Sequence, residues 1–192
     1  MNLCVFAGSS PGAHADYRAA AEDLARVLAR RGIGLVYGGA RVGLMGMLAD
    51  TMLAHQGEVT GVIPESLMTK EIAHDGLTAL HVVGSMHERK ALMADLSAGF
   101  IALPGGWGTL EELFEALTWA QLGLHRKPCG LVNVRGFYDG LLAFIDHSIA
   151  ERFVRQDYRA MMLVDATADG LLDQVAAYVP PAVPKWLDRE ER

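Results

Sequence analysis

The sequence predicts an α/β protein with a doubly wound, Rossmann-like parallel sheet that is covered by helices on both faces. Short apolar segments alternate along the chain with longer segments of helical periodicity, which is typical of repeated strand–helix units. The predicted strands are apolar throughout rather than on one face, as in buried parallel sheets. Three glycine-rich turns each follow a predicted strand, so we expect them at the carboxyl edge of the sheet, where such folds bind ligands.

The first half of the chain contains four short apolar segments, and we expect strands at 3–7, 34–37, 58–63 and 77–83. Helical periodicity predicts helices at about 16–31, 44–56 and 86–96. Ser85 and Glu88 have the spacing of a capping box at the start of the third helix. The stretch 64–76 is irregular and polar, which favours a loop over a site.

The second half continues the same alternation, with predicted strands at 99–103, 129–134 and 162–164. Helices are expected from the motif PGGWGTLEE (104–112) to about 122, over about 138–151, and from Asp169 onward. No linker is long enough to divide the chain. We therefore expect a single domain over residues 1–180 and a C-terminal tail over 181–192.

Composition narrows the function. The 192 residues, 51% of them apolar, suffice for one core. A net charge of −6 without a basic stripe argues against nucleic acid as a partner. The two cysteines are expected as reduced core residues, and the histidines show no metal-ligand spacing, so we expect no metal. Neither a signal peptide nor a membrane-spanning run is evident, which predicts a cytoplasmic protein without a membrane partner.

The PGGWGTLEE motif predicts an anion site. Gly105, Gly106 and Gly108 let the backbone approach a ligand, and the first N–H groups of the following helix point towards it. A purely structural alternative exists, because Thr109 and Glu112 also have the spacing of a capping box. Three glycines in this turn exceed what a cap requires. The motif therefore favours a ligand that carries a phosphate.

The predicted fold is shared with dinucleotide-binding proteins, but the sequence argues against a dinucleotide as the ligand. The first glycine-rich turn lacks the G-x-G-x-x-G spacing, and the second strand runs into Gly38-Gly39 instead of an acidic residue that would hold a ribose. A mononucleotide or a sugar phosphate fits better. Trp107 could stack on its base or merely pack the turn.

Arg89 is predicted to lie on the buried face of its helix, within the stripe formed by Leu92, Met93 and Leu96. A buried guanidinium needs an anionic or hydrogen-bonding partner. Helices that follow parallel strands begin at the same sheet edge, so we expect Arg89 close to Glu112. A structural Arg–Glu pair between two helix ends is the alternative to a functional one.

Further polar residues follow on the helix that PGGWGTLEE opens. Glu112 lies away from its apolar stripe and can turn towards the glycine loop. Glu111 and Glu115 are expected on a solvated face. Thr118 lies two turns into the helix, where its hydroxyl can bond back to the helix backbone.

At PGGWGTLEE and MHERK (86–90), the sequence resembles the LOG ("lonely guy") family of cytokinin-activating phosphoribohydrolases, long labelled "possible lysine decarboxylases". The resemblance runs from about Phe6 to Val179. It includes GSS at 8–10, VYGG at 36–39, VGLMG at 42–46, GVIPESLM at 61–68 and TWAQLGLH at 118–125. Ala40 departs from the pattern, because the family usually has a third glycine there.

The resemblance implies a homodimer that hydrolyses the N-glycosidic bond of AMP, or of an N6-modified AMP, to the free base and ribose 5-phosphate. It implies no cofactor. Arg89 and Glu112 are implied as catalytic residues. The implied substrate contacts are Glu71, Arg89, Lys90, Gly106, Trp107, Gly108, Thr109, Leu110, Glu111, Glu112 and Thr118.

This chemistry suits the residues. Breaking a ribosyl–nitrogen bond builds oxocarbenium charge at C1′, which the carboxylate of Glu112 can stabilise while it positions water. A phosphate held at Gly106–Thr109 supplies remote binding energy. Arg89 can orient Glu112 together with the ribose or the phosphate.

The residues alone leave two other functions as alternatives. A nucleotide or cofactor carrier could use the same fold without turnover. An amino-acid decarboxylase would need a lysine to anchor pyridoxal phosphate. Of Lys70, Lys90, Lys127 and Lys185, only Lys90 lies near the predicted site, so the decarboxylase is disfavoured.

Overall fold

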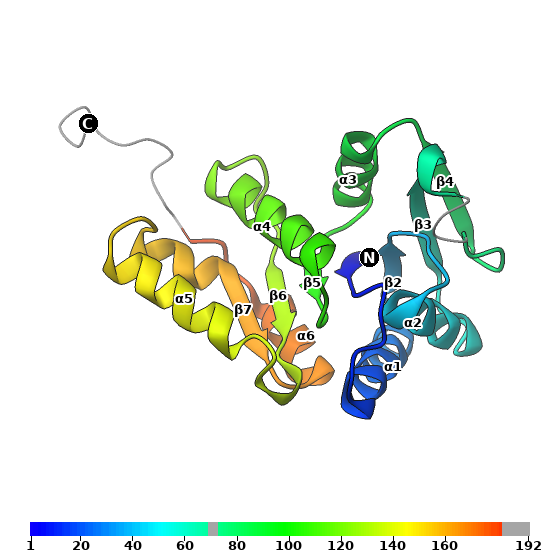
Figure 1. The fold of residues 1–192 in the computed structure, drawn as a ribbon, viewed down its shortest axis with the longest axis horizontal. Coiled ribbons are helices and arrows are strands. Elements are labelled where there is room, and N and C mark those ends of the chain that lie inside the picture. Colours follow the sequence, from blue (N-terminus) through cyan, green and yellow to red (C-terminus); the bar gives the residue numbers. More distant parts are fainter. Residues whose placement is uncertain (69–72, 182–192) are drawn as a thin grey trace.

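The computed structural model describes residues 1–68 and 73–181, which form a seven-stranded, all-parallel sheet (Figure 1). The strand order is β4-β3-β2-β1-β5-β6-β7. The order reverses between β1 and β5, which makes the crevice at their carboxyl ends the expected ligand position. The strands are β1 (Asn2–Phe6), β2 (Gly34–Tyr37), β3 (Val59–Pro64), β4 (Ala79–Val83), β5 (Phe100–Ala102), β6 (Cys129–Val132) and β7 (Met162–Asp165).

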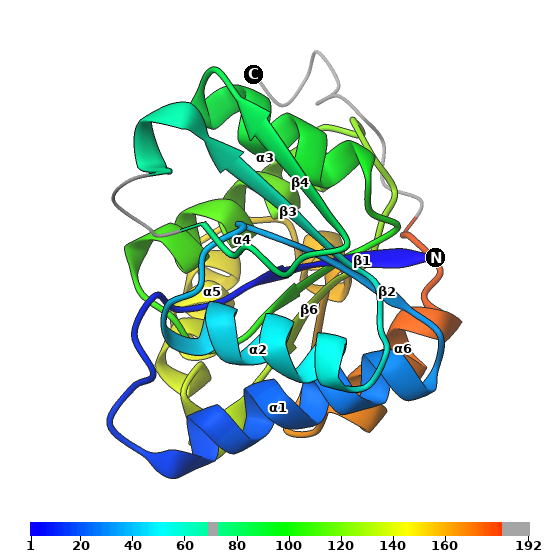
Figure 2. The same ribbon diagram turned by 90° about the vertical axis from the view of Figure 1, so that its right-hand side faces the viewer.

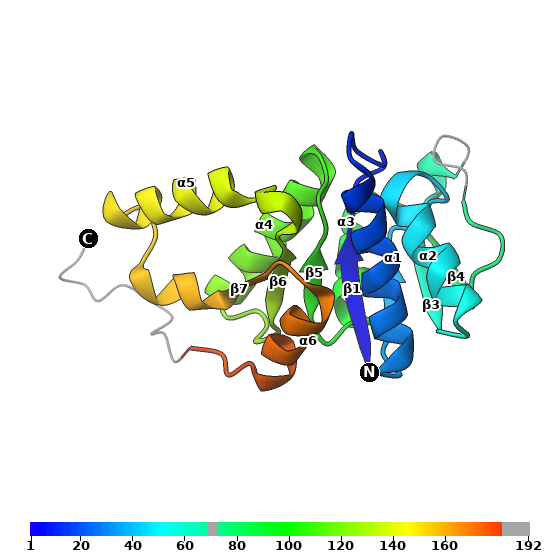
Figure 3. The ribbon, with the colours of Figure 1, turned by 90° about the horizontal axis from the view of Figure 1, so that it is seen from below.

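Helices cover both faces of the sheet, as Figures 2 and 3 show. The α-helices are α1 (Ala15–Arg30), α2 (Gly43–Ala54), α3 (Met86–Asp95), α4 (Trp107–Gln121), α5 (Asp139–Ala150) and α6 (Ala168–Ala177), and three 3₁₀ turns are η1 (Glu65–Leu67), η2 (Val134–Gly136) and η3 (Gln156–Met161). Helices α1, α2 and α6 pack on one face, and α3, α4 and α5 pack on the other. Over the described residues, no helix is long and apolar enough to cross a membrane.

The central strand shows why the sequence adopts this fold. Leu3 and Val5 of β1 belong to the core under α1, α2 and α6, whereas Cys4 and Phe6 belong to the opposite core. Successive side chains of a strand point to opposite faces, so a strand covered on both sides must be apolar throughout. The predicted doubly wound α/β fold is confirmed. The edge strand β4 differs, because Leu80 and Val82 are exposed.

The glycine-rich turns after β1, β2 and β5 are joined to one another at the carboxyl edge. The Gly8 N–H donates to Pro104 O (3.3 Å), and the Leu44 N–H donates to Gly8 O (3.0 Å). A Cβ added at Gly43 would overlap the backbone of Ser9. Glycine at these places therefore lets the three turns pack into one surface.

The first turns of α3 and α4 have different caps. Ser85 Oγ accepts the Glu88 N–H (3.1 Å), and the Glu88 carboxylate accepts the Gly84 N–H (2.9 Å), so the predicted cap of α3 is confirmed. The alternative capping box of α4 is wrong. That helix begins at Trp107 with Gly106 as its N-cap, and glycine has no side chain that could cap it, while Thr109 lies buried inside the first turn.

Candidate active site

A cavity of about 280 Å³ opens at the carboxyl edge of the sheet. Four elements contribute to its wall: the turn after β1, the first turn of α2, the first turn of α3 and the beginning of α4. The lining residues from these elements are Ala7, Gly8 and Ser9; Met45; Met86 and Arg89; and Gly106, Trp107, Gly108, Thr109, Glu111 and Glu112.

The beginning of α4 presents backbone donors to this cavity. The first hydrogen bond of the helix runs from the Leu110 N–H to Gly106 O (3.1 Å). The N–H groups of residues 107–109 therefore have no acceptor within the helix, and all three residues line the cavity. A Cβ at Gly106 or Gly108 would meet no atom within 4 Å. The donors thus adjoin open space, where the helix dipole favours an anion.

Gly105 has a different role from its two neighbours in the motif. A Cβ at Gly105 would overlap the Thr109 side chain and would come within 3.0 Å of Gly8 N. Its lack of a side chain therefore allows the loop to pack against Thr109 and the first glycine-rich turn. Gly105 therefore leaves no room for a ligand, contrary to the prediction. Gly106 and Gly108 do leave room, as predicted.

Arg89 reaches the cavity from α3, and its side chain is almost fully buried. Its Nε donates to Val62 O (3.0 Å), and its Nη2 donates to Gly38 O (2.9 Å). A Cβ at Gly38 would overlap Nη2, so glycine is required there for the guanidinium to fit. Two neutral carbonyls therefore fix a positive charge in the cavity wall.

Glu112 lies on the α4 side of the same cavity and is partly buried. The charges of Glu112 and Arg89 both shift the pKa of the Cys4 thiol in β1. Burial raises the pKa of Cys4 well above its usual value, the Glu112 carboxylate raises it further, and the Arg89 guanidinium lowers it. The two charges thus lie near the same part of β1. Cys4 remains a protonated thiol and no nucleophile.

Lys90 points to the other side of α3 and joins it to α4. Its Nζ lies 2.6 Å from Glu111 Oε1 and 2.9 Å from Glu115 Oε1. Glu111 is exposed as predicted, with 56% of its side chain accessible, whereas Glu115 is only 25% exposed, and both carboxylates pair with Lys90. Burial lowers the pKa of Lys90, but the two hydrogen bonds outweigh burial and raise it. The amine accordingly stays protonated.

The structure brings most, but not all, of the predicted site residues together. Arg89, Glu111, Glu112 and the run 106–109 line one cavity, and Trp107 stands at its rim with a 90% exposed side chain. Leu110 packs into the core under α3, α4 and α5. Glu71 lies outside the described residues.

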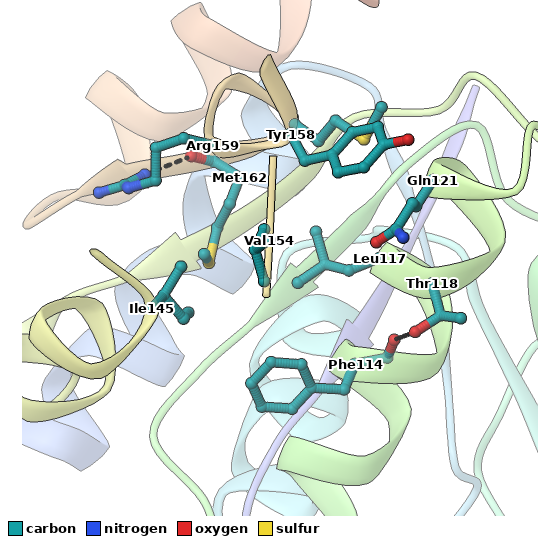
Figure 4. A pocket seen from close by; sticks show the side chains of 10 residues that line it. Phe114, Leu117, Thr118, Gln121, Ile145, Val154, Tyr158, Arg159 and Met162 are labelled. Carbon is teal, nitrogen blue, oxygen red and sulfur yellow. Dashed lines mark hydrogen bonds between the residues drawn. The ribbon is translucent and has the colours of Figure 1, made fainter. Parts of the chain in front are cut away.

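Thr118 lies elsewhere on α4, beside a second, smaller pocket of about 120 Å³ (Figure 4). The walls of this pocket come from α4, α5 and the chain around η3. The Thr118 hydroxyl donates to Phe114 O (2.7 Å), which is the predicted bond back to the helix. The described chain does not place Thr118 in the cavity that holds Arg89 and Glu112.

Sequence reasoning missed Ser9, Met45 and Met86 as cavity residues. Ser9 lies in the glycine-rich turn after β1, so the rule that ligands bind at the carboxyl edge could have indicated it. Met45 is 9% exposed and both packs in the core and lines the cavity. Within residues 1–68 and 73–181, no group of three or more potential metal ligands is found.

Comparison with known proteins decides the family. The family described as "Possible lysine decarboxylase" matches residues 45–175. A rice protein named probable cytokinin riboside 5′-monophosphate phosphoribohydrolase LOGL5 is 51% identical over 93% of this chain and 73% of its own length. The chain belongs to the LOG family. The predicted resemblance is therefore confirmed.

Two further relatives place the LOG family in plants and in bacteria. The rice cytokinin riboside 5′-monophosphate phosphoribohydrolase LOG is 48% identical over 93% of this chain and 74% of its own length. The protein of that activity name from Rhodococcoides fascians is 51% identical over 89% of this chain and 87% of its own length.

Solved structures with low sequence identity share the LOG fold. The molybdenum cofactor binding protein of Rippkaea orientalis superposes with a TM-score of 0.68 at 21% identity, over 92% of this chain and 95% of its own. The molybdenum cofactor carrier protein of Chlamydomonas reinhardtii gives 0.68 at 20% identity, over 92% and 98%. At such identities the likeness extends to the fold alone.

Proposed function

We propose that this protein hydrolyses the N-glycosidic bond of adenosine 5′-monophosphate or its N6-modified forms, such as cytokinin riboside 5′-monophosphates, releasing the base and ribose 5-phosphate. The observation that carries the proposal is one cavity with a helix N-terminus, a buried arginine and a carboxylate in its wall. Relatives about half identical to this chain bear the name of that activity.

The beginning of α4 binds the 5′-phosphate in this proposal. The backbone donors of residues 107–109 border open space, and glycine at 106 and 108 leaves room for phosphate oxygens. A phosphate held there is remote from the bond that breaks. Its binding energy can therefore be used to hold C1′ of the ribose in the reactive position.

Glu112 acts at the reacting carbon. It lies one turn beyond the proposed phosphate position, so a ribose bound through its 5′-phosphate reaches the carboxylate. As the ribosyl–nitrogen bond breaks, positive charge grows on C1′ and the ring oxygen. A carboxylate beside that carbon stabilises this charge and accepts a hydrogen bond from the attacking water.

Arg89 has a positioning and electrostatic role in the proposal. Its bonds to two backbone carbonyls fix the guanidinium before substrate binds. A charge fixed in this way can orient Glu112 and the ribose or phosphate without reorganisation during the reaction. Lys90, by contrast, is engaged by Glu111 and Glu115. Its proposed substrate contact would require one of these pairs to open.

A nucleotide or cofactor carrier is the weaker alternative. The carrier is supported only by a solved carrier protein that shares the fold at about 20% sequence identity. The hydrolase is supported by relatives at about 50% identity that are named phosphoribohydrolases. Incubation with AMP separates the two. A hydrolase releases adenine at a constant rate, and a carrier returns the AMP intact.

Removal of the 5′-phosphate is expected to reduce kcat/KM by about a hundredfold or more, because charged hydrogen bonds at a helix N-terminus contribute several kcal/mol in a desolvated site. The measurement compares AMP with adenosine in steady-state release of adenine. Equal values for the two substrates would mean that the α4 terminus does not bind phosphate.

The purified protein is expected to carry no pyridoxal phosphate. An internal aldimine needs a neutral lysine amine, and the two carboxylates beside Lys90 raise its pKa and keep it charged. Absorbance spectra before and after borohydride test this expectation. A reducible aldimine band together with carbon dioxide released from lysine would support a decarboxylase instead.

A homodimer is part of the proposal. Helices α4 and α5 and the following loop expose Phe114, Phe144 and Phe153, and the chain after α4 exposes Leu122 and Leu124. Exposed apolar side chains of this size support the association of two copies. A cytoplasmic location is also proposed, because both buried cysteines are free thiols, which suits a reducing compartment.

A further inference from the structure

A buried histidine outside the cavity makes contacts that reach Arg89. His74 is 4% exposed and lies between η1 and β4. Its Nδ1 lies 3.1 Å from the Gly76 N, and its Nε2 lies 3.0 Å from Asp50 Oδ1 on α2. A backbone N–H only donates, so Nδ1 must be the acceptor and Nε2 must carry the proton. The contacts therefore specify a neutral imidazole with one tautomer.

Residues 73–76, which we call the strap, are tied to the glycine-rich turn after β2. The His74 N–H donates to Gly39 O (3.0 Å), and Ala73 forms an isolated antiparallel bridge with Ala40. Asp75 forms an ion pair with Arg41. The strap thus contacts the turn through three consecutive residues, and the His74 side chain ties it to α2.

The turn that the strap holds is the one that positions Arg89. Gly38 O accepts the hydrogen bond from Arg89 Nη2, and the space beside Gly38 is filled by that nitrogen. The next residue, Gly39, has a φ of 77°, a conformation that glycine adopts easily but does not enforce. Because glycine restricts its own backbone angles less than other residues do, the bonds from the strap help to set the geometry of this turn.

We infer that His74, together with Asp50, is a positioning residue for catalysis: it fixes the strap on the turn after β2, and the turn fixes the Arg89 guanidinium in the cavity. The kinetic tests of this inference rest on the proposed function, because they measure hydrolysis of AMP. His74 itself touches no substrate in this scheme. Its effect passes from the imidazole to the strap, from the strap to Gly39, and from the Gly38 carbonyl to Arg89.

Three substitutions separate this role from simple stability. His74→Leu removes both side-chain bonds at similar volume, and it is expected to lower kcat/KM for AMP by about tenfold or more. His74→Gln retains one donor and one acceptor, and Asp50→Asn retains the acceptor without its charge. Both are expected to stay within about threefold of wild type, because a neutral imidazole needs hydrogen bonds rather than an ion pair.

A double substitution tests whether the effect passes through Arg89. Arg89→Lys cannot bond both carbonyls in the same way, so adding His74→Leu should cost little further activity. If the losses multiply, the strap acts by another route and the inference is wrong. It is equally wrong if His74→Leu lowers the melting temperature but leaves kcat/KM unchanged.

A crystal structure of the His74→Leu variant gives a readout that needs no turnover. The inference predicts that Arg89 Nη2 moves out of hydrogen-bonding distance of Gly38 O. An unchanged contact overturns it, even if the proposed activity is absent. Asp50→Ala serves if the leucine variant does not fold, because Asp50 is 67% exposed. The same displacement is expected there, with a severalfold loss in kcat/KM, and an undisturbed Arg89 overturns the inference.

Discussion

Replacing Glu112 with glutamine is expected to lower kcat for adenine release from AMP by about a hundredfold or more, with little change in AMP affinity. The substitution keeps the size and helix propensity of the side chain and removes the negative charge that would stabilise the oxocarbenium ion. Helix α4 begins at Trp107 with Gly106 as its N-cap, so Thr109 and Glu112 do not occupy the positions of a capping box. A change in unfolding free energy of about 1 kcal/mol or less is therefore expected.

The matched control is Glu22→Gln on α1, where an exposed carboxylate pairs only loosely with exposed Arg26 at 3.6 Å. It applies the same chemical change on a surface helix and should leave turnover and melting temperature unchanged. Steady-state kinetics and thermal melts on both variants make the comparison. Wild-type turnover in the Glu112→Gln variant would show that the carboxylate is not catalytic.

Arg89→Ala is expected to reduce kcat/KM by about a hundredfold to a thousandfold, because it removes the fixed positive charge from the cavity. It should also weaken AMP binding if the guanidinium reaches the phosphate or ribose. Some loss of stability, on the order of 1–3 kcal/mol, is expected because the Val62 and Gly38 carbonyls lose their donor. The stability loss makes this variant ambiguous on its own.

Gly38→Ala resolves the ambiguity. The added Cβ would overlap Arg89 Nη2, the end of a flexible side chain, so the fold can persist while the guanidinium is displaced. We expect at least a tenfold loss in kcat/KM with a small change in melting temperature. The control is Gly140→Ala on α5, where a Cβ would meet no atom within 4 Å. A fully active Gly38→Ala enzyme would show that the position of Arg89 does not matter.

Sequence patterns predicted the fold because the central β strands are buried on two sides, which makes them apolar throughout, and the segments between the strands have helical periodicity. In β1, for example, Leu3 and Val5 pack into the core on one face of the sheet, and Cys4 and Phe6 pack into the core on the other face. The burial of Arg89 was likewise predicted from its place in the stripe of α3. Its partners could not be predicted, because Val62 and Gly38 lie 27 and 51 residues away and contribute only backbone carbonyls.

The errors at α4 arose from tertiary contacts that override local motifs. Thr109 and Glu112 have the spacing of a capping box, but the Thr109 side chain is buried beside Gly105, and the helix begins three residues earlier than a cap at Thr109 would allow. Glu115 was expected on a solvated face, yet it is partly buried and pairs with Lys90 of α3. Neither contact is visible in the local sequence pattern.

The most direct test of the proposed hydrolysis is the stoichiometry of products from AMP with the wild-type protein. Chromatography for adenine and an enzymatic assay for ribose 5-phosphate are run on the same time course. Hydrolysis at the Glu112 cavity predicts one ribose 5-phosphate for each adenine, over many turnovers and without added metal or cofactor. Intact AMP recovered in full from the bound state, or adenosine and phosphate as the products, would contradict it.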